Sequence, residues 1–148
     1  MSEKNVLESL FRLVHAVKRQ LQVQAEQLNL GISPMHIRVL KIIDRKSPCT
    51  AVDIASFLGR DKAQITRLVG SLMEHGLITR QPNPNDKRSH YLRTTAAGEA
   101  IVRKISTIDK KTLQLMTKDL EPEALSEFQR ISQLMADNLG SQTDKADS

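Results

Sequence analysis

Residues 59–76 read GRDKAQITRLVGSLMEHG, a stretch that predicts one helix with two unlike faces. Asp61 is placed to cap the start of this helix, and Gln64 follows at the spacing of a capping box. Gly76 is placed to end it in a left-handed conformation. Apolar residues recur at helical spacing and predict the buried face; they are Ile65, Leu68, Val69, Leu72 and Met73.

The opposite face of this helix has small and hydrogen-bonding side chains together with cations. Such a face can approach the edges of base pairs closely. An ordinary solvated helix is the alternative, so the flanking sequence has to decide between the two. If the helix binds DNA, the expected contact residues are Lys62, Ala63, Gln64, Thr66, Arg67 and Ser71.

The preceding segment predicts two further helices. Ser33-Pro34 has the N-cap and first-turn residues typical of a helix start, and Pro48 disfavours helix at the residue before it. Thr50 is placed to cap a short third helix, and Gly59 provides the turn that follows. A short helix, a turn with glycine and a second helix with a polar outer face indicate a helix-turn-helix.

The segment after Gly76 changes to the period of β-structure. Residues 77–81 and 89–93 each predict a short strand. Between them, residues 82–88 read PNPNDKR, which is dense in turn-forming residues and contains two adjacent cations. We therefore expect a β-hairpin wing with a basic tip beside the helix-turn-helix.

Both flanks predict long amphipathic helices. The first spans about residues 3–29, and its apolar stripe is wide enough to serve both the chain's own core and a second subunit. Thr95 is placed to cap a long helix that breaks at Pro122, and a final helix follows to about Leu139. Residues 141–148 are polar and lack periodicity, which predicts a disordered tail.

The chain has 148 residues and a net charge of +5, with 39% hydrophobic and only 3% aromatic residues. These values fit one compact helical domain with a core of aliphatic side chains. Residues 33–93 contain 11 Lys/Arg and 5 Asp/Glu, a net charge of +6, whereas the remainder has a net charge of −1. This concentration of positive charge predicts a polyanion as the partner of the central segment.

The sequence argues against several other classes of protein. No apolar run reaches the length of a membrane span, and no signal peptide is predicted, so we expect a cytoplasmic protein without membrane contact. Cys49 is the single cysteine and is expected to be a packing residue. The four histidines lack metal-ligand spacing, and no nucleophile–base–acid set or phosphate loop is present, so we expect no metal, no cofactor and no enzyme.

These elements resemble the MarR family of winged-helix transcriptional regulators over nearly the whole chain. The most specific match is DKRS at residues 86–89, which is similar to the family's D-x-R wing signature. TAAG at residues 95–98 resembles a T-x-x-G motif after the second wing strand, and EHGLI at residues 74–78 resembles an E-x-G-L-[IV] helix end. Thr94 departs from the family, which usually has an apolar residue at that place.

The resemblance implies a mainly α fold with a small β-hairpin wing. Residues 33–94 would form a winged helix-turn-helix lobe that binds DNA. Residues 1–32 and 95–140 would form a helical dimerisation region with N- and C-terminal helices.

The resemblance also implies how DNA is bound. A homodimer would set two central helices into successive major grooves of a near-palindromic site in double-stranded DNA. Arg88 would enter the minor groove beside Lys87, and an ion pair with Asp86 would hold it. The alternative for Asp86 and Arg88 is an ordinary surface ion pair.

Members of the family commonly bind small aromatic acids between the dimer helices and the DNA-binding lobe. Polar groups for such an anion could come from the first two helices, with solvated or interfacial side chains as the alternative. The candidate ligand-binding residues are Arg12, His15, Arg19 and His36.

We therefore interpret the chain as a homodimeric, sequence-specific DNA-binding regulator, in particular a repressor that a small ligand releases from its operator. A non-specific architectural DNA-binding protein is the first alternative, and a scaffold or enzyme that reuses the fold is the second. Salt would weaken DNA binding by either kind of DNA-binding protein, but only the regulator should strongly prefer one site over random DNA.

Overall fold

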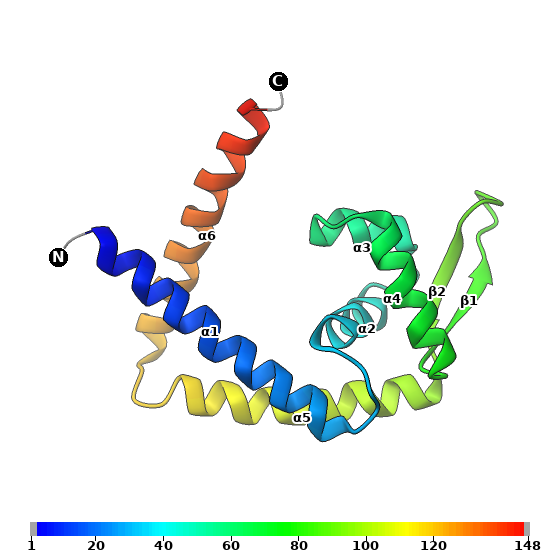
Figure 1. The fold of residues 1–148 in the computed structure, drawn as a ribbon, viewed down its shortest axis with the longest axis horizontal. Coiled ribbons are helices and arrows are strands. Elements are labelled where there is room, and N and C mark those ends of the chain that lie inside the picture. The colour runs from blue at the N-terminus through cyan, green and yellow to red at the C-terminus, as the bar shows by residue number, and fades with distance from the viewer. Residues whose placement is uncertain (1–2, 147–148) are drawn as a thin grey trace. The chain divides into compact units, whose positions relative to one another are not determined.

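The computed structural model describes residues 3–146, whose contacts form two compact units that divide between Asp109 and Lys110. The boundary falls inside a helix, and the first unit contains both the first helix and the predicted DNA-binding lobe. The elements are α1 (Glu3–Leu28), α2 (Pro34–Lys46), α3 (Ala51–Leu58), α4 (Lys62–Glu74), β1 (Ile78–Pro82), β2 (His90–Thr94), α5 (Ala96–Met116) and α6 (Pro122–Ala146) (Figure 1).

The starts of α2 and α3 have the side-chain caps that the sequence predicts. The Ser33 hydroxyl accepts from the backbone N–H of His36, and His36 Nδ1 accepts in return from the N–H of Ser33 at 3.1 Å. Thr50 and Asp53 form the same reciprocal pair at the start of α3. Gly59 has φ +61° and ends α3, so the turn into α4 is tight.

The end of α4 is as predicted, but its start is not. Gly76 has φ +70°, and the N–H groups of Gly76 and Leu77 donate to the carbonyls of Met73 and Leu72, which is a Schellman motif. At the other end Asp61 is the N-cap residue, but its side chain makes no capping hydrogen bond. The predicted capping box is therefore wrong: this helix start is exposed, so water can satisfy its first N–H groups.

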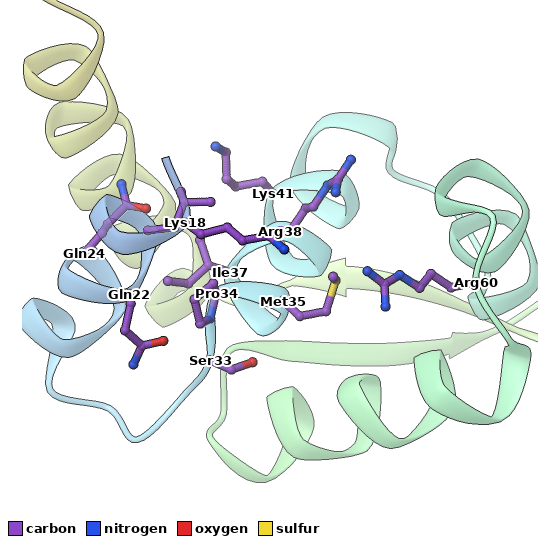
Figure 2. A pocket seen from close by; sticks show the side chains of 11 residues that line it. Lys18, Gln22, Gln24, Ser33, Pro34, Met35, Ile37, Arg38, Lys41 and Arg60 are labelled. Carbon is purple, nitrogen blue, oxygen red and sulfur yellow. The ribbon is translucent and has the colours of Figure 1, made fainter. Parts of the chain in front are cut away.

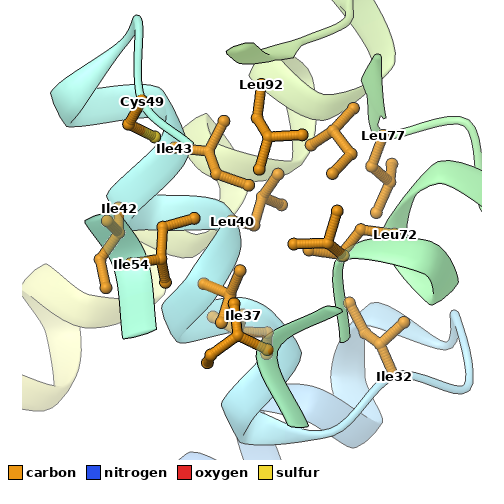
Figure 3. Close-up of a cluster of buried hydrophobic side chains, with 14 of the residues drawn as sticks. Ile32, Ile37, Leu40, Ile42, Ile43, Cys49, Ile54, Leu72, Leu77 and Leu92 are labelled. Atoms are coloured by element: carbon orange, nitrogen blue, oxygen red, sulfur yellow. The ribbon is translucent and has the colours of Figure 1, made fainter. Parts of the chain in front are cut away.

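The core of the first unit is a cluster of aliphatic side chains from α2, α3, α4 and the hairpin (Figure 3). Leu40, Ile43, Ile54 and Leu72 are fully buried in it, and Ile105 of α5 is buried as well. Truncating such a buried side chain to Ala costs about 2–5 kcal/mol. This cluster therefore fixes α4 against α2 and α3, with the opposite face of α4 left outside.

β1 and β2 form a two-stranded antiparallel sheet in which Arg80 lies opposite Leu92. Each strand begins one residue later than predicted, and the first begins later because Leu77 completes the end of α4. Leu92 is buried, and its N–H donates to the carbonyl of Cys49 at 2.8 Å. That bond ties the wing to the segment just before α3.

Thr95 joins the wing to α5. Its hydroxyl donates to the carbonyl of Gly76 at 2.6 Å and accepts from the N–H of Gly98 at 3.1 Å. Its own N–H donates to the carbonyl of Leu77 at 3.0 Å. The predicted cap of α5 is confirmed, and the same threonine attaches the start of α5 to the end of α4.

The second unit begins at Lys110 within α5 and continues through α6. The apolar side of α6 is largely exposed, including Phe128 and Leu134. No helix in the described part of the chain is long and apolar enough to cross a membrane.

The helix α6 corrects the prediction of a disordered tail over residues 141–148, because its backbone is helical to Ala146. Residues 141–146 contain no proline, and extending an existing helix by one residue costs little. Residues 147–148 of the predicted tail lie outside the described residues.

Candidate nucleic-acid interface

The outer face of α4 is the first part of the site. Ile65, Val69 and Leu72 turn into the core as predicted, whereas Leu68 and Met73 are only partly buried. The residues on the outer face fall into two groups: Lys62, Ala63, Thr66 and Arg67 are exposed, and Gln64 and Ser71 are half-buried.

A hydrogen bond within α4 limits what the Thr66 side chain can offer a ligand, whereas the contact of Ser71 uses only its backbone carbonyl. The Thr66 hydroxyl donates to the carbonyl of Lys62 at 2.9 Å, so it is left as an acceptor with a methyl group beside it. The Ser71 carbonyl lies 2.8 Å from His75 Nδ1, one turn further along the helix. The hydrogen-bond donors on this face that remain for DNA are therefore those of Lys62, Gln64, Arg67 and the Ser71 hydroxyl.

The positive charges of the site have no ion-pair partner among the residues that the structure describes. Among the described residues the ion pairs are Lys41–Asp109 and Arg130–Glu127, and neither includes a cation of α4 or the wing. The guanidinium groups of Arg67 and Arg88 thus keep their full charge for an external anion.

The wing tip consists of two successive turns. Asn83 and Asp86 open them, and their carbonyls accept from the N–H groups of Asp86 and Ser89 at 3.2 and 3.3 Å. The Asp86 carboxylate accepts from the backbone N–H of Arg88 at 2.9 Å. In the described residues no Asp86–Arg88 ion pair forms, which corrects our expectation: the carboxylate is engaged by the turn's backbone, and the guanidinium projects free of it.

A groove of about 340 Å³ connects α4 with the wing and the start of α3. It brings together Lys62 and Thr66 of α4 with Arg88 of the wing. Arg80 and His90, which the sequence motifs do not single out, also line it. The alternation of β1 could have indicated Arg80, because Arg80 follows Ile78 by two residues and therefore lies on the same face of the strand.

A second cavity, of about 650 Å³, lies between α1 and α2 (Figure 2). Lys18, Arg38 and Arg60 give it three cations besides Lys41, which is paired with Asp109, and Leu21, Met35 and Ile37 give it apolar surface. The cavity therefore suits a small molecule with both an anionic group and an apolar body.

The sequence-predicted ligand residues lie elsewhere. Arg12, His15 and Arg19 are exposed on α1 and do not line this cavity. His36 is held by the cap of α2, where its Nδ1 accepts from the Ser33 N–H and lies 2.6 Å from the Ser33 hydroxyl. Burial, together with the nearby His75, lowers the pKa of His36 below its ordinary value of 6.5. A neutral, capping imidazole is a poor partner for an anion.

Asp109 links three helices of the first unit. Its carboxylate accepts from the amide of Gln24 and forms an ion pair with Lys41, both at 2.7 Å. Gln24 is a buried polar residue within the apolar stripe of α1, and this contact provides a hydrogen-bond partner for its side-chain amide. Gln24 and Lys41 also line the 650 Å³ cavity, so Asp109 holds two of the side chains that line it.

Cys49 is buried in the core cluster. Burial, with a smaller contribution from Asp53, raises the pKa of its thiol. Both properties agree with a packing residue. Groups of three or more metal-ligating side chains are absent from the described part of the chain.

A helix-turn-helix followed by a two-stranded wing, with unpaired cations on both, defines a winged-helix protein of the kind that binds double-stranded DNA. The sequence pattern of the MarR family matches residues 32–90 of this chain. The multiple antibiotic resistance protein MarR of Escherichia coli is 31% identical over 128 residues, which cover 82% of this chain and 87% of that protein.

Two further relatives agree. The HTH-type transcriptional regulator PetP of Rhodobacter capsulatus is 26% identical over 69% of this chain, and the match spans 61% of PetP. A crystal structure of mutant E. coli MarR complexed with operator DNA is similar with a TM-score of 0.73 and 27% identity, over 91% of this chain and 99% of that one. The chain belongs to the MarR family of winged-helix transcription regulators.

Proposed function

We propose that this protein is a cytoplasmic transcriptional regulator that binds a near-palindromic operator as a homodimer. The observation that carries the proposal is the groove in which Lys62 and Thr66 of α4 and Arg88 of the wing face one surface without internal ion pairs. Helix α4 would present hydrogen-bond donors to base edges in the major groove, and the wing would present the Arg88 guanidinium to the adjacent minor groove. Phosphate contacts from Lys62, Lys87 and Arg80 would add affinity without sequence preference.

A second copy of the chain is the proposed partner of the exposed apolar side chains. On α1, Leu7 is 57% exposed and Phe11 is 65% exposed, with Leu10 and Val14 on the same stripe. On α6, Phe128 and its neighbours form another exposed apolar face. Contiguous apolar surface of this kind marks an interface, and two-fold pairing would also supply the second recognition helix that a near-palindromic site needs.

We also propose repression relieved by a small aromatic carboxylate. The 650 Å³ cavity supports this step better than Arg12, His15 and Arg19 do, since Lys18 and Arg38 lie beside its apolar surface and are not ion-paired among the described residues. A ligand can release DNA only to the extent that it binds the DNA-free form more tightly, and DNA must weaken the ligand by the same factor. Replacement of Arg38 by Gln should blunt release, whereas replacement of Arg12 or His15 should not.

Selection of bound sequences from random duplex DNA tests the main proposal. A regulator should enrich one near-palindromic site, and at physiological salt it should bind that site at least about 10³-fold more tightly than random DNA. Recovery of no preferred sequence, with equal salt dependence on all duplexes, would leave a non-specific architectural DNA-binding protein as the better interpretation.

The ligand is tested on the selected operator. Benzoate and other small aromatic carboxylates are titrated into the protein–DNA complex, first with the wild-type protein and then with Arg38→Gln and Arg12→Gln. If no acid shifts the wild-type curve, the ligand part of the proposal fails while the DNA-binding part stands.

A further inference from the structure

We propose that Asn83 is a positioning residue for DNA recognition: its side chain holds the wing tip in one conformation and so presents Arg88 to the minor groove. The inference rests on the proposed role of Arg88 at the operator. It adds a residue that has no charge, lies outside the D-x-R signature and does not need to touch DNA.

The hydrogen bonds of Asn83 span the whole tip. Its Oδ1 accepts from the N–H of Asn85 at 3.0 Å, and its carbonyl accepts from the N–H of Asp86 at 3.2 Å. Its Nδ2 donates to the Ser89 hydroxyl at 2.9 Å, which closes the loop between the end of β1 and the start of β2. One side chain thus fixes the first turn and joins the two ends of the loop.

Asn83 and Asp86 have equivalent places in consecutive turns. Each accepts, through its side chain, from the N–H two residues further on, which is Asn85 in the first turn and Arg88 in the second. The second turn starts from Asp86, whose N–H is held by the Asn83 carbonyl. The position of Arg88 therefore depends on the first turn as well as on its own.

Burial separates Asn83 from the rest of the tip. Asn83 and Ser89 are half-buried, whereas the residues between them are exposed. Exposed turns are kept in shape by their own hydrogen bonds, because few packing contacts oppose their motion. Loss of the Asn83 amide would leave the tip with several conformations. DNA binding would then be weaker by the free energy needed to order the tip.

Asn suits this place better than Asp for a chemical reason. An amide both donates and accepts, so it can bind the Asn85 N–H and the Ser89 hydroxyl together. Asp at this position would add a second carboxylate close to Asp86, and the DNA phosphates would repel it.

The test is a double-mutant cycle on duplexes that differ only in the flanks where the wing is expected, A·T-rich in one and G·C-rich in the other. The proteins are wild type, Asn83→Ala, Arg88→Ala and the double variant. Asn85→Ala is the matched control, because its side-chain amide lies in the same loop but makes none of the tip's hydrogen bonds. Order parameters of the backbone N–H groups of residues 85–89 are measured without DNA.

We expect Asn83→Ala to lower those order parameters and to reduce the preference for A·T-rich flanks about 3- to 10-fold, the range expected for loss of a hydrogen bond. The double variant should bind as weakly as Arg88→Ala alone, since Asn83 acts through Arg88. Ser89→Ala should reproduce part of the effect of Asn83→Ala, and Asn85→Ala should leave the flank preference unchanged.

Three results would overturn the inference. If the losses from Asn83→Ala and Arg88→Ala multiply in the double variant, or if Asn83→Ala leaves the flank preference intact, Asn83 does not act through Arg88. If Arg88→Ala itself leaves the flank preference unchanged, the proposed minor-groove role of Arg88 fails, and the role of Asn83 fails with it.

Discussion

The α-carbon of Gly98 lies against the backbone carbonyl of Leu77, so closely that a Cβ on Gly98 would overlap the Leu77 oxygen. The Leu77 carbonyl carbon would also lie only 3.0 Å from that Cβ. The obstacle is backbone, which cannot move aside as the end of a long side chain can. This approach explains why glycine follows Thr95 by three residues: Thr95 binds the carbonyls of Gly76 and Leu77, and Gly98 leaves room for the second of them.

We therefore expect Gly98→Ala to destabilise the protein by about 1–3 kcal/mol, the usual cost of overpacking. Chemical denaturation of both proteins measures this. Gly140→Ala is the matched control, since Gly140 lies in α6 with no atom near its would-be Cβ, and Ala is favoured over Gly in a helix by about 1 kcal/mol. A Gly98→Ala protein as stable as wild type would mean that α5 can shift away from Leu77 without cost.

Replacement of Arg67 by Ala tests the base-reading face of α4. The exposed, unpaired guanidinium of Arg67 should contribute about 1–3 kcal/mol on the selected operator, with relaxed preference at one base pair in each half-site. Lys62→Ala should weaken binding equally on all sequences and reduce its salt dependence. Titrations of operator and random duplex at two salt concentrations separate the two effects. Equal loss on both duplexes would reassign Arg67 to the phosphate backbone.

A charge on the exposed stripe of α1 tests the dimer. Val14 is 39% exposed in the single chain, and in the proposed dimer it would be buried. Val14→Asp should therefore yield a monomeric or unfolded protein that does not bind the operator, because an unpaired buried carboxylate is costly. Ala16→Asp, on the opposite side of the same helix, should remain dimeric. Sedimentation of both variants decides, and a folded Val14→Asp dimer with normal binding would show that the stripe faces elsewhere.

The pKa of His36 predicts a loss of stability in mild acid. Its folded pKa lies below the ordinary value of 6.5, so below that pH the unfolded chain binds more protons than the folded one. The contribution of His36 to the free energy of unfolding is full above pH 6.5 and is lost as the pH falls through the folded pKa. His36→Gln is the matched variant, since Gln at this position can keep the capping box without titrating. Denaturation is measured over a range of roughly pH 5 to 8, which is centred on the ordinary histidine pKa of about 6.5. The free energy of unfolding should change less with pH for His36→Gln than for the wild type. Identical profiles would show that His36 does not cause the loss of stability in acid.

The buried thiol of Cys49 should react slowly with an aromatic disulfide reagent at neutral pH. Both its burial and its raised pKa reduce the amount of accessible thiolate. Absorbance of the released thiol measures the rate, and the denatured protein provides the reference. A native rate equal to that of the denatured protein would show that the segment before α3 opens readily.

Residue type and spacing account for most of the local structure. The caps of α2 and α3, the Gly76 end of α4 and the turn-rich tip of the wing all depend on residues within a few places of one another. Such contacts form whenever the local backbone forms, so residue type and spacing were enough to predict them. The helical period of α4 likewise separated its buried face from its outer face before any packing was known.

Contacts between side chains that are far apart in the sequence depend on how the elements pack. Gln24 and Asp109 are 85 residues apart, and no local pattern pairs them. Arg80 and His90 line the groove beside α4 because the hairpin packs there, and the cations of the 650 Å³ cavity come from α1, α2 and the turn after α3. The free side chain of Asp61 and the backbone contact of Asp86 have the same explanation. A carboxylate binds whichever donor the folded chain places nearest, or water if none is near, and residue spacing does not reveal that choice.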